Sequence, residues 1–147
     1  MVSGTLRRRK RAGAAAIEMA FVIIPVMLFL IGVFQYGRLL MDWNVLNNAA
    51  REGCRYALVN NTASTISTDV QNVVTTRMGN ETANFTNFTV TVSGSHNGAS
   101  TAVNNLVAGD MITVTVSGKY KFMSLPLVPT PTLTINSAVT MLCEGAT

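Results

Sequence analysis

The sequence predicts an α+β protein: one long N-terminal helix, transmembrane and then amphipathic, packed on a small antiparallel sheet of about three strands plus one short helix. Three observations support this class. An apolar run opens the chain, helical spacing continues past it, and the second half alternates apolar and polar residues between turn-rich loops. Charged residues make up only 12% of the 147 residues, which is low for an average soluble protein.

The excess of basic residues comes from one end of the chain. The formal net charge is +4, and one cluster accounts for it: Arg7, Arg8, Arg9, Lys10 and Arg11. From Arg38 onward, acids and bases are equal in number. A basic cluster directly before an apolar run is typical of a topogenic signal that stays in the cytoplasm. A nucleic-acid-binding arm is the competing interpretation, but the rest of the chain is neutral, so no nucleic-acid partner is expected.

The apolar run is long enough to cross a bilayer if it includes one acid. Met19–Phe34 carries no charge, and extending it back through Glu18 to Ala12 gives about 34 Å of helix at roughly 1.5 Å per residue. A bilayer core needs about 30 Å. A removable secretory signal would have small residues after its apolar core, whereas Gly13 precedes it here. The sequence therefore predicts a membrane partner and a single span over residues 14–37, with the C-terminal part outside the cytoplasm.

Helical spacing continues beyond the span, over residues 38–59. One stripe of this helix carries Leu39, Trp43, Leu46, Ala50, Gly53 and Ala57. The side chains shrink toward the C-terminal end of the stripe, which allows another backbone to approach closely. Two interpretations stay open: the stripe is covered by the outer domain of this protein, or it faces another chain.

Residues 60–147 are predicted to form a small outer domain that begins with a polar loop and a short helix. Ile66, Val70, Val73 and Val74 recur at helical spacing, with a capping box starting at Thr68 and a C-terminal cap at Gly79. Strands are expected at Phe85–Val92, Met111–Phe122 and Thr132–Leu142, with a turn-rich loop at Ser93–Ala102 and a bulge at Gly118. Short connections between successive strands favour an antiparallel meander.

The chain has two cysteines, Cys54 near the end of the long helix and Cys143 directly after the last strand. Outside the cytoplasm, disulfides form and persist. A Cys54–Cys143 bridge is therefore expected, and the chain-entropy model gives it at most about 4 to 5 kcal/mol of stability. Two free buried thiols are the alternative.

The N-terminal residues resemble the processing site of type IV prepilins. The basic leader is followed by Gly13, by four small or apolar residues, and then by Glu18 and Met19. In the Tad branch of type IV prepilins, an aromatic residue often stands at the position of Met19. Farther on, "QYGRLL" (Gln35–Leu40) and "NNAAREGCRYA" (Asn47–Ala57) resemble the signature of the TadE-like family, and "SAVTMLCEG" is similar to its last strand. These proteins are minor pseudopilins of the Tad, or Flp, tight-adherence pilus system. The resemblance extends over Ala12–Ala57 well and over the sheet loosely.

The resemblance implies a pilin-like fold and a subunit that acts in pilus assembly and surface adhesion at the bacterial cytoplasmic (inner) membrane. A prepilin peptidase would remove residues 1–13 by cutting between Gly13 and Ala14. The new amine of Ala14 would lie one helical turn from Glu18, which could pair with it or with a neighbour's amine and so register subunits. A Glu18 that only reaches the headgroups is the alternative. Other Tad pilin-like subunits and inner-membrane assembly proteins are the implied partners.

No motif in the sequence indicates catalysis. His96 is the only histidine, and it lies in a loop rich in Ser, Gly and Asn. No cluster has metal-ligand spacing, and no glycine-rich phosphate loop follows a strand. The sequence therefore predicts no enzyme, no metal site and no cofactor. An unprocessed single-span anchor whose outer domain binds an envelope partner stays open as the alternative function.

Overall fold

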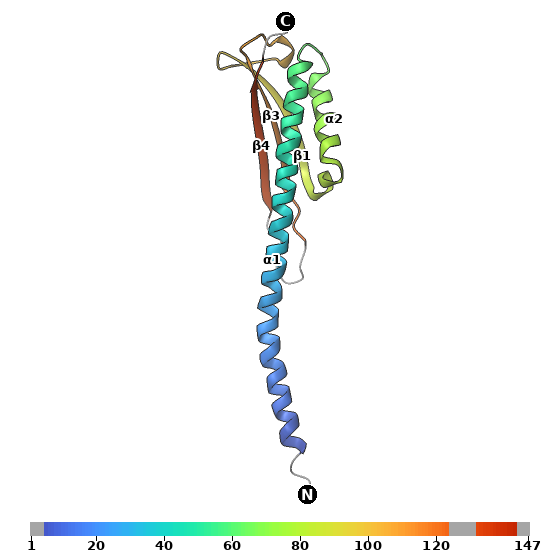
Figure 1. Cartoon of the computed structure of the whole chain (residues 1–147), viewed down its shortest axis with the longest axis vertical. Coiled ribbons are helices and arrows are strands. Elements are labelled where there is room, and N and C mark those ends of the chain that lie inside the picture. Colours follow the sequence, from blue (N-terminus) through green and yellow to red (C-terminus); the bar gives the residue numbers. More distant parts are fainter. Residues whose placement is uncertain (1–4, 124–131, 144–147) are drawn as a thin grey trace. The chain divides into compact units, whose positions relative to one another are not determined.

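The computed structural model describes residues 5–123 and 132–143 of the chain (Figure 1). Side chains before Gly13 lie outside this description, and so do those of the five cations predicted as topogenic. Pro126, Pro129 and Pro131, which lie between the last two predicted strands, are also outside it. The chain divides into two compact units, Met1–Arg38 and Leu39–Thr147.

The first unit is helical and has an apolar, exposed surface. Its described residues belong to α1 (Thr5–Val59), which contains Pro25. Every side chain from Gly13 to Leu30 is exposed, including Phe21 at 83% of its surface. Exposing apolar surface to water costs roughly 25 cal/mol per Å², so this surface favours a non-aqueous surrounding. Membrane helices also tolerate proline better than helices in water.

The second unit contains the rest of α1 and all other elements. These are α2 (Ile66–Met78), η1 (Gly79–Asn84), β1 (Phe85–His96), β2 (Ala99–Thr101), η2 (Val103–Asn105), β3 (Met111–Tyr120) and β4 (Leu133–Leu142). The strands form one antiparallel sheet in the order β2-β1-β3-β4. The predicted α+β class is confirmed, with four strands in place of about three.

The additional strand comes from a hairpin where a loop was predicted. β1 continues past Val92 to His96, and His96 pairs with Ala99 across the turn. The two turn residues have positive φ values, 49° at Asn97 and 83° at Gly98. Asn-Gly is the preferred pair for a two-residue hairpin turn with φ above zero at both positions. The predicted loop over Ser93–Ala102 is therefore wrong, and the Asn-Gly pair was the signal that identifies the hairpin.

A bulge is present, but on the strand opposite the predicted position. Thr86 pairs with Lys119 and Thr89 pairs with Ser117, so two residues of β1 oppose Gly118 of β3. Asn87, in the bulge, has φ 53°. The Phe85 ring covers Gly118, because a Cβ added to that glycine would lie 3.1 Å from Phe85 Cδ1. Gly118 thus provides space for an aromatic ring while its neighbour on β1 carries the irregularity.

The short helix begins earlier than predicted and ends as predicted. Its N-cap is Thr65, whose hydroxyl donates to Asp69 Oδ2 at 2.7 Å, so the predicted cap at Thr68 is wrong. Ile66, the first residue with the predicted helical spacing, is also the first residue of the helix and is buried. Gly79 is the C-cap with φ 55°, and its N–H donates to the Thr75 carbonyl. A positive φ at this position favours glycine.

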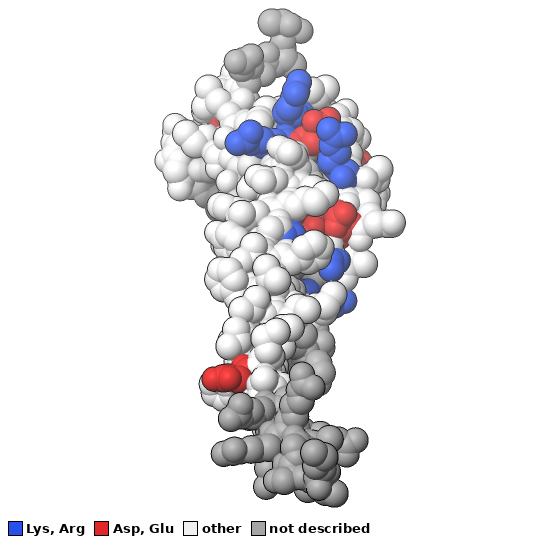
Figure 2. All heavy atoms as spheres, turned by 60° about the horizontal axis from the view of Figure 1, so that its bottom comes forward, with Lys and Arg blue, Asp and Glu red and all other residues white. Residues whose placement is uncertain are grey.

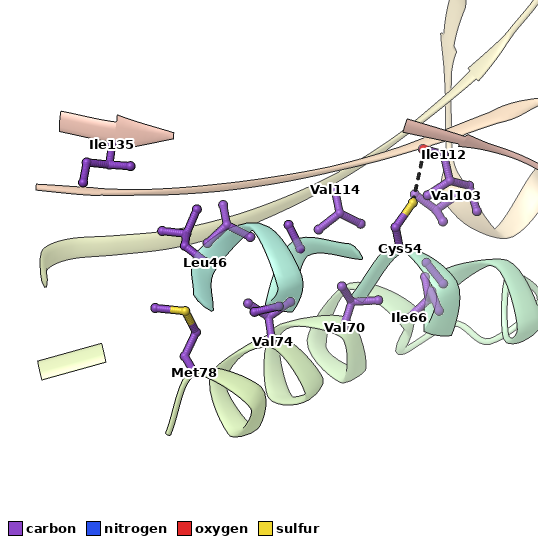
Figure 3. Close-up of a cluster of buried hydrophobic side chains, with 14 of the residues drawn as sticks. Leu46, Cys54, Ile66, Val70, Val74, Met78, Val103, Ile112, Val114 and Ile135 are labelled. Atoms are coloured by element: carbon purple, nitrogen blue, oxygen red, sulfur yellow. Dashed lines mark hydrogen bonds between the residues drawn. The ribbon is translucent and has the colours of Figure 1, made fainter. Parts of the chain in front are cut away.

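One hydrophobic cluster joins the elements of the second unit (Figure 3). Leu46 of α1, Val70 and Val74 of α2, and Ile112 and Val114 of β3 are fully buried in it. Inward-facing residues alternate along β3 with outward-facing ones, as expected for a sheet covered on one face. The core thus fixes the second half of α1 against α2 and the sheet.

Candidate functional site

The predicted processing and registration residues lie on one exposed stretch of α1. Gly13, Ala14 and Glu18 are exposed, and a Cβ added to Gly13 would meet no atom within 4 Å. Ala14 and Glu18 are four residues apart, so they lie on the same side of the helix. Among the described residues, Glu18 is the only acid before Asp42. The charged side chains visible in Figure 2 form a few clusters on a largely uncharged surface.

Within the described part of the chain, α1 is the one helix long and apolar enough to cross a membrane, by length and composition. None of its apolar window is buried in the protein. An apolar core helix of a water-soluble domain would be covered by its own chain, and this stretch is not. The long apolar helix therefore suggests membrane anchoring.

The stripe on the second half of α1 is covered by α2 and the sheet of the same unit. Ala50, Gly53 and Ala57 are buried, which confirms the first of the two interpretations drawn from the sequence. A Cβ on Gly53 would lie 2.6 Å from Val74 Cγ2, so α2 approaches α1 most closely here. Trp43 departs from the pattern, since 45% of its surface is exposed.

Asp42, which is not one of the stripe residues, is a buried acid on α1. Only 1% of its surface is exposed, and Asn84 Nδ2 donates to its Oδ2 at 3.0 Å. The same amide nitrogen lies 2.5 Å from Glu81 Oε2, and the Lys121 backbone N–H donates to the Asn84 carbonyl at 2.8 Å. Asn84 therefore joins α1, η1 and the end of β3. No local pattern could identify this contact, because the two partners are 42 residues apart.

A second acid, Asp110, is held at the other end of β3. Its Oδ1 lies 2.5 Å from Nδ1 of the half-exposed His96, and its Oδ2 accepts the Val107 N–H at 2.9 Å. The Val107 hydrogen bond, followed by the bond and charge of His96, lowers the pKa of Asp110 despite its burial. The Asp110 carbonyl also accepts the Cys143 N–H at 2.7 Å. The predicted loop histidine thus serves as a local contact for a buried carboxylate.

The two cysteines are buried and unbridged in this structure. Cys54 Sγ donates to the Ile112 carbonyl at 3.5 Å, as Figure 3 shows. Burial raises the pKa of both thiols. The nearby Cys143 adds to the effect on Cys54, whereas the Asn61 side chain lowers the pKa of Cys143 by hydrogen bonding. The predicted disulfide stays a prediction.

No group of three or more His, Cys, Asp and Glu side chains suited to hold a metal ion occurs among the described residues. The two polar clusters, around Asp42 and Asp110, have their carboxylates engaged by protein donors. The described chain thus combines an exposed apolar helix with a packed α+β unit.

These features define a class of protein with a long apolar N-terminal helix, which suggests membrane anchoring, and a small α+β unit. Residues 13–55 match the family model described as TadE-like protein, which confirms the resemblance inferred from the sequence motifs. The matched stretch begins at Gly13 and ends one residue after Cys54, so it contains Glu18 and most of the helical stripe. No curated protein and no solved structure matches the chain.

Proposed function

We propose that this protein is a TadE-like minor pseudopilin that acts in Tad, or Flp, pilus assembly and surface adhesion. The match over residues 13–55 carries the proposal, because it joins the processing residues, the apolar helix and the helical stripe in one segment. A protein of this kind works by packing and association, and its contribution to adhesion is structural. Its partners are the membrane, a prepilin peptidase, other Tad pilin-like subunits and inner-membrane assembly proteins.

Processing at Gly13 is the first step of the proposed function. The peptidase cuts between Gly13 and Ala14 and removes the basic leader, residues 1–13. The exposure of Gly13 and the space around it support access by an enzyme. The apolar run lies after the cut and stays in the mature protein, where residues 14–37 span the cytoplasmic (inner) membrane once.

The cations from Arg7 to Arg11 hold the N-terminus in the cytoplasm before cleavage, and residues 38–147 lie outside it. Residues 38–59 continue the helix and residues 60–147 complete the outer domain. These boundaries are part of the proposal.

Glu18 is the proposed registration group. Its side chain is exposed on the stretch from Gly13 to Leu30, where every other residue is apolar, so Glu18 is the one acid there that a neighbouring subunit's cationic amine could pair with. An acid at the bilayer centre costs roughly 2.5 to 3.5 kcal/mol on insertion scales, and a cationic partner offsets part of that cost. Pairing with the amine of Ala14, in the same or a neighbouring chain, favours one relative position of two subunits.

The N-terminal residue of protein purified from membranes tests the proposal against the unprocessed anchor. The wild-type chain should begin at Ala14, and Gly13→Leu should retain residues 1–13, because the peptidase requires a small residue at the cut. Gly32→Leu is the matched control, since Gly32 is also exposed with no atom within 4 Å of an added Cβ. A wild-type chain that keeps Arg7 to Arg11 would favour the single-span anchor with an outer domain that binds an envelope partner.

A further inference from the structure

One end of the second unit exposes apolar side chains together with two lysines. The exposed apolar residues are Met41 and Trp43 of α1, Met123 after β3, and Leu133 at the start of β4. The first two expose 61% and 45% of their surface, and the last two expose 57% and 43%. Lys119, near the end of β3, and Lys121, directly after it, are also exposed. We call this set the proximal collar.

Printed contacts place these residues at a common end of the unit. Asp42 of α1 accepts the Asn84 amide, and the Lys121 N–H donates to the Asn84 carbonyl. Tyr120, the last residue of β3, pairs with Leu133, the first residue of β4. The start of this part of α1, the end of β3 and the start of β4 therefore lie together.

The carboxylates at this end are turned toward protein partners. Asp42 is buried, and Glu81 is partly buried, with Asn84 Nδ2 close to a carboxylate oxygen of each. Both lysine side chains, in contrast, are exposed, and Lys121 Nζ donates to the Ala83 carbonyl at 3.2 Å. The exposed charge contributed by these residues is therefore mainly positive.

We infer that the proximal collar lies in the headgroup layer of the membrane that holds α1, where the lipid surface is its binding partner. The inference rests on the proposed membrane anchoring, because the collar is the end of the unit that the chain joins to the apolar helix. Tryptophan is enriched at the membrane–water interface, where its ring meets apolar chains and its N–H meets water. Lysines near such a surface attract anionic headgroups by about 1 kcal/mol each.

The opposite end of the second unit also exposes apolar side chains and can therefore serve as a control for the collar. Val59, Val107, Met111 and Leu142 expose between 49% and 82% of their surface there. That end holds His96 and Asp110 and has no lysine in the described chain. It is also the end at which α1 stops, so the chain does not continue from it into the apolar run.

Trp43 is the only tryptophan of the chain, so its fluorescence reports on the collar without any substitution. The full chain is reconstituted in vesicles of phosphatidylcholine and phosphatidylglycerol, with a fraction of the lipids carrying a nitroxide on the headgroup. Trp43 should emit at a shorter wavelength than in water, lose most of its fluorescence to the headgroup nitroxide, and be poorly quenched by iodide. In the control Trp43→Phe/Val59→Trp, the introduced tryptophan should be quenched by iodide and little by the nitroxide.

Flotation of the same vesicles on a sucrose gradient separates failure of the inference from failure of anchoring. If the chain floats but Trp43 is quenched by iodide and not by the nitroxide, the collar does not contact the headgroups and only this inference is wrong. If the chain does not float, the membrane anchoring fails and the inference fails with it.

The lysines give a second, independent measurement. Lys119→Gln/Lys121→Gln should reduce the nitroxide quenching of Trp43 in vesicles with phosphatidylglycerol and change it little in pure phosphatidylcholine. Arg51→Gln/Arg55→Gln is the matched control, because both arginines are exposed on α1 toward its end. Equal responses of the two double variants would contradict a role of the collar lysines in lipid binding.

Discussion

The two halves of α1 share one helix and have opposite surroundings. From Gly13 to Leu30 all side chains are exposed, whereas Leu46, Ala50, Gly53 and Cys54 in the second half are buried against α2 and the sheet. The first half is apolar on all sides, and the second is apolar on a stripe. A helix that is apolar all round requires lipid or another protein, and a striped one requires a single packed partner. The comparison shows that the sequence period indicates how much of each half's surface has to be covered, but not by what.

The predicted disulfide has the largest expected effect on the free energy of unfolding. It would stabilise only the unit that contains the second half of α1. Oxidation with a small disulfide, such as oxidised glutathione, transfers two electrons and two protons from Cys54 and Cys143 and forms the S–S bond. The bridge should raise the free energy of unfolding of the second unit by at most about 4 to 5 kcal/mol. Because the raised pKa of both thiols disfavours the thiolate, oxidation should be slow in the folded state. Non-reducing mass spectrometry detects the bridge, and two alkylated thiols in native, unreduced protein would contradict it.

Leucine-to-alanine substitutions should give the second-largest effect, and their effect on the free energy of unfolding should differ between the two halves of α1. Leu46→Ala should lower the free energy of unfolding of the second unit by about 2 to 5 kcal/mol, because Leu46 is fully buried. Leu30→Ala, at a residue 56% exposed in the first half, should change it by less than about 0.5 kcal/mol. Urea unfolding in detergent micelles, followed by circular dichroism, measures both. Equal losses would mean that the first half also packs on the folded unit.

Glycine substitutions sharpen the same comparison with a smaller effect. Gly53→Ala would bring a methyl group to 2.6 Å from Val74 Cγ2, and overpacking of this kind costs about 1 to 3 kcal/mol. Gly32→Ala meets no atom within 4 Å and should be neutral or slightly stabilising, because alanine is the better helix former. Adding Val74→Ala to Gly53→Ala should recover part of the loss. A neutral Gly53→Ala variant would show that α1 and α2 are less closely packed than in this structure.

The smallest expected effect is on the pH dependence of the stability of the second unit in acid. The pKa of Asp110 is lowered from its ordinary value of 3.8, first by the Val107 N–H and then by His96. Its stabilising contribution is therefore complete above pH 3.8 and is lost as the pH falls through the lower, folded-state pKa. Asp110→Asn should remove this part of the acid dependence, and His96→Gln should keep some of it because the Val107 bond remains. Thermal unfolding between pH 2 and 5 measures the slope, and an unchanged slope in Asp110→Asn would contradict the assignment.

The sequence was sufficient for the features that depend on local period. The long helix, the short helix with its Gly79 cap, and three strands followed from spacing and turn residues. The Asn97-Gly98 hairpin was also visible in the sequence, but Ser and Gly residues around it favoured a loop. No local pattern predicted the burial of Asp42 and Asp110. Their partners, Asn84 and His96, come from elements distant along the chain. The covering of the stripe likewise depended on which partner packs at Gly53, and spacing alone does not name a partner.

Glu18→Gln is the most direct test of the proposed role of the first half of α1, which is the registration of subunits. The substitution keeps the side chain's size and removes its charge, so insertion, cleavage after Gly13 and the packing of the second unit should all persist. Association with other pilin-like subunits should weaken, by about 1 kcal/mol for an exposed pair and by more for one shielded from water. Co-purification of tagged subunits from membranes, wild type against Glu18→Gln, measures this loss. Recovery of the same partners in the same amounts, with piliation intact, would show that Glu18 only reaches the headgroups and that the first half of α1 does not register subunits.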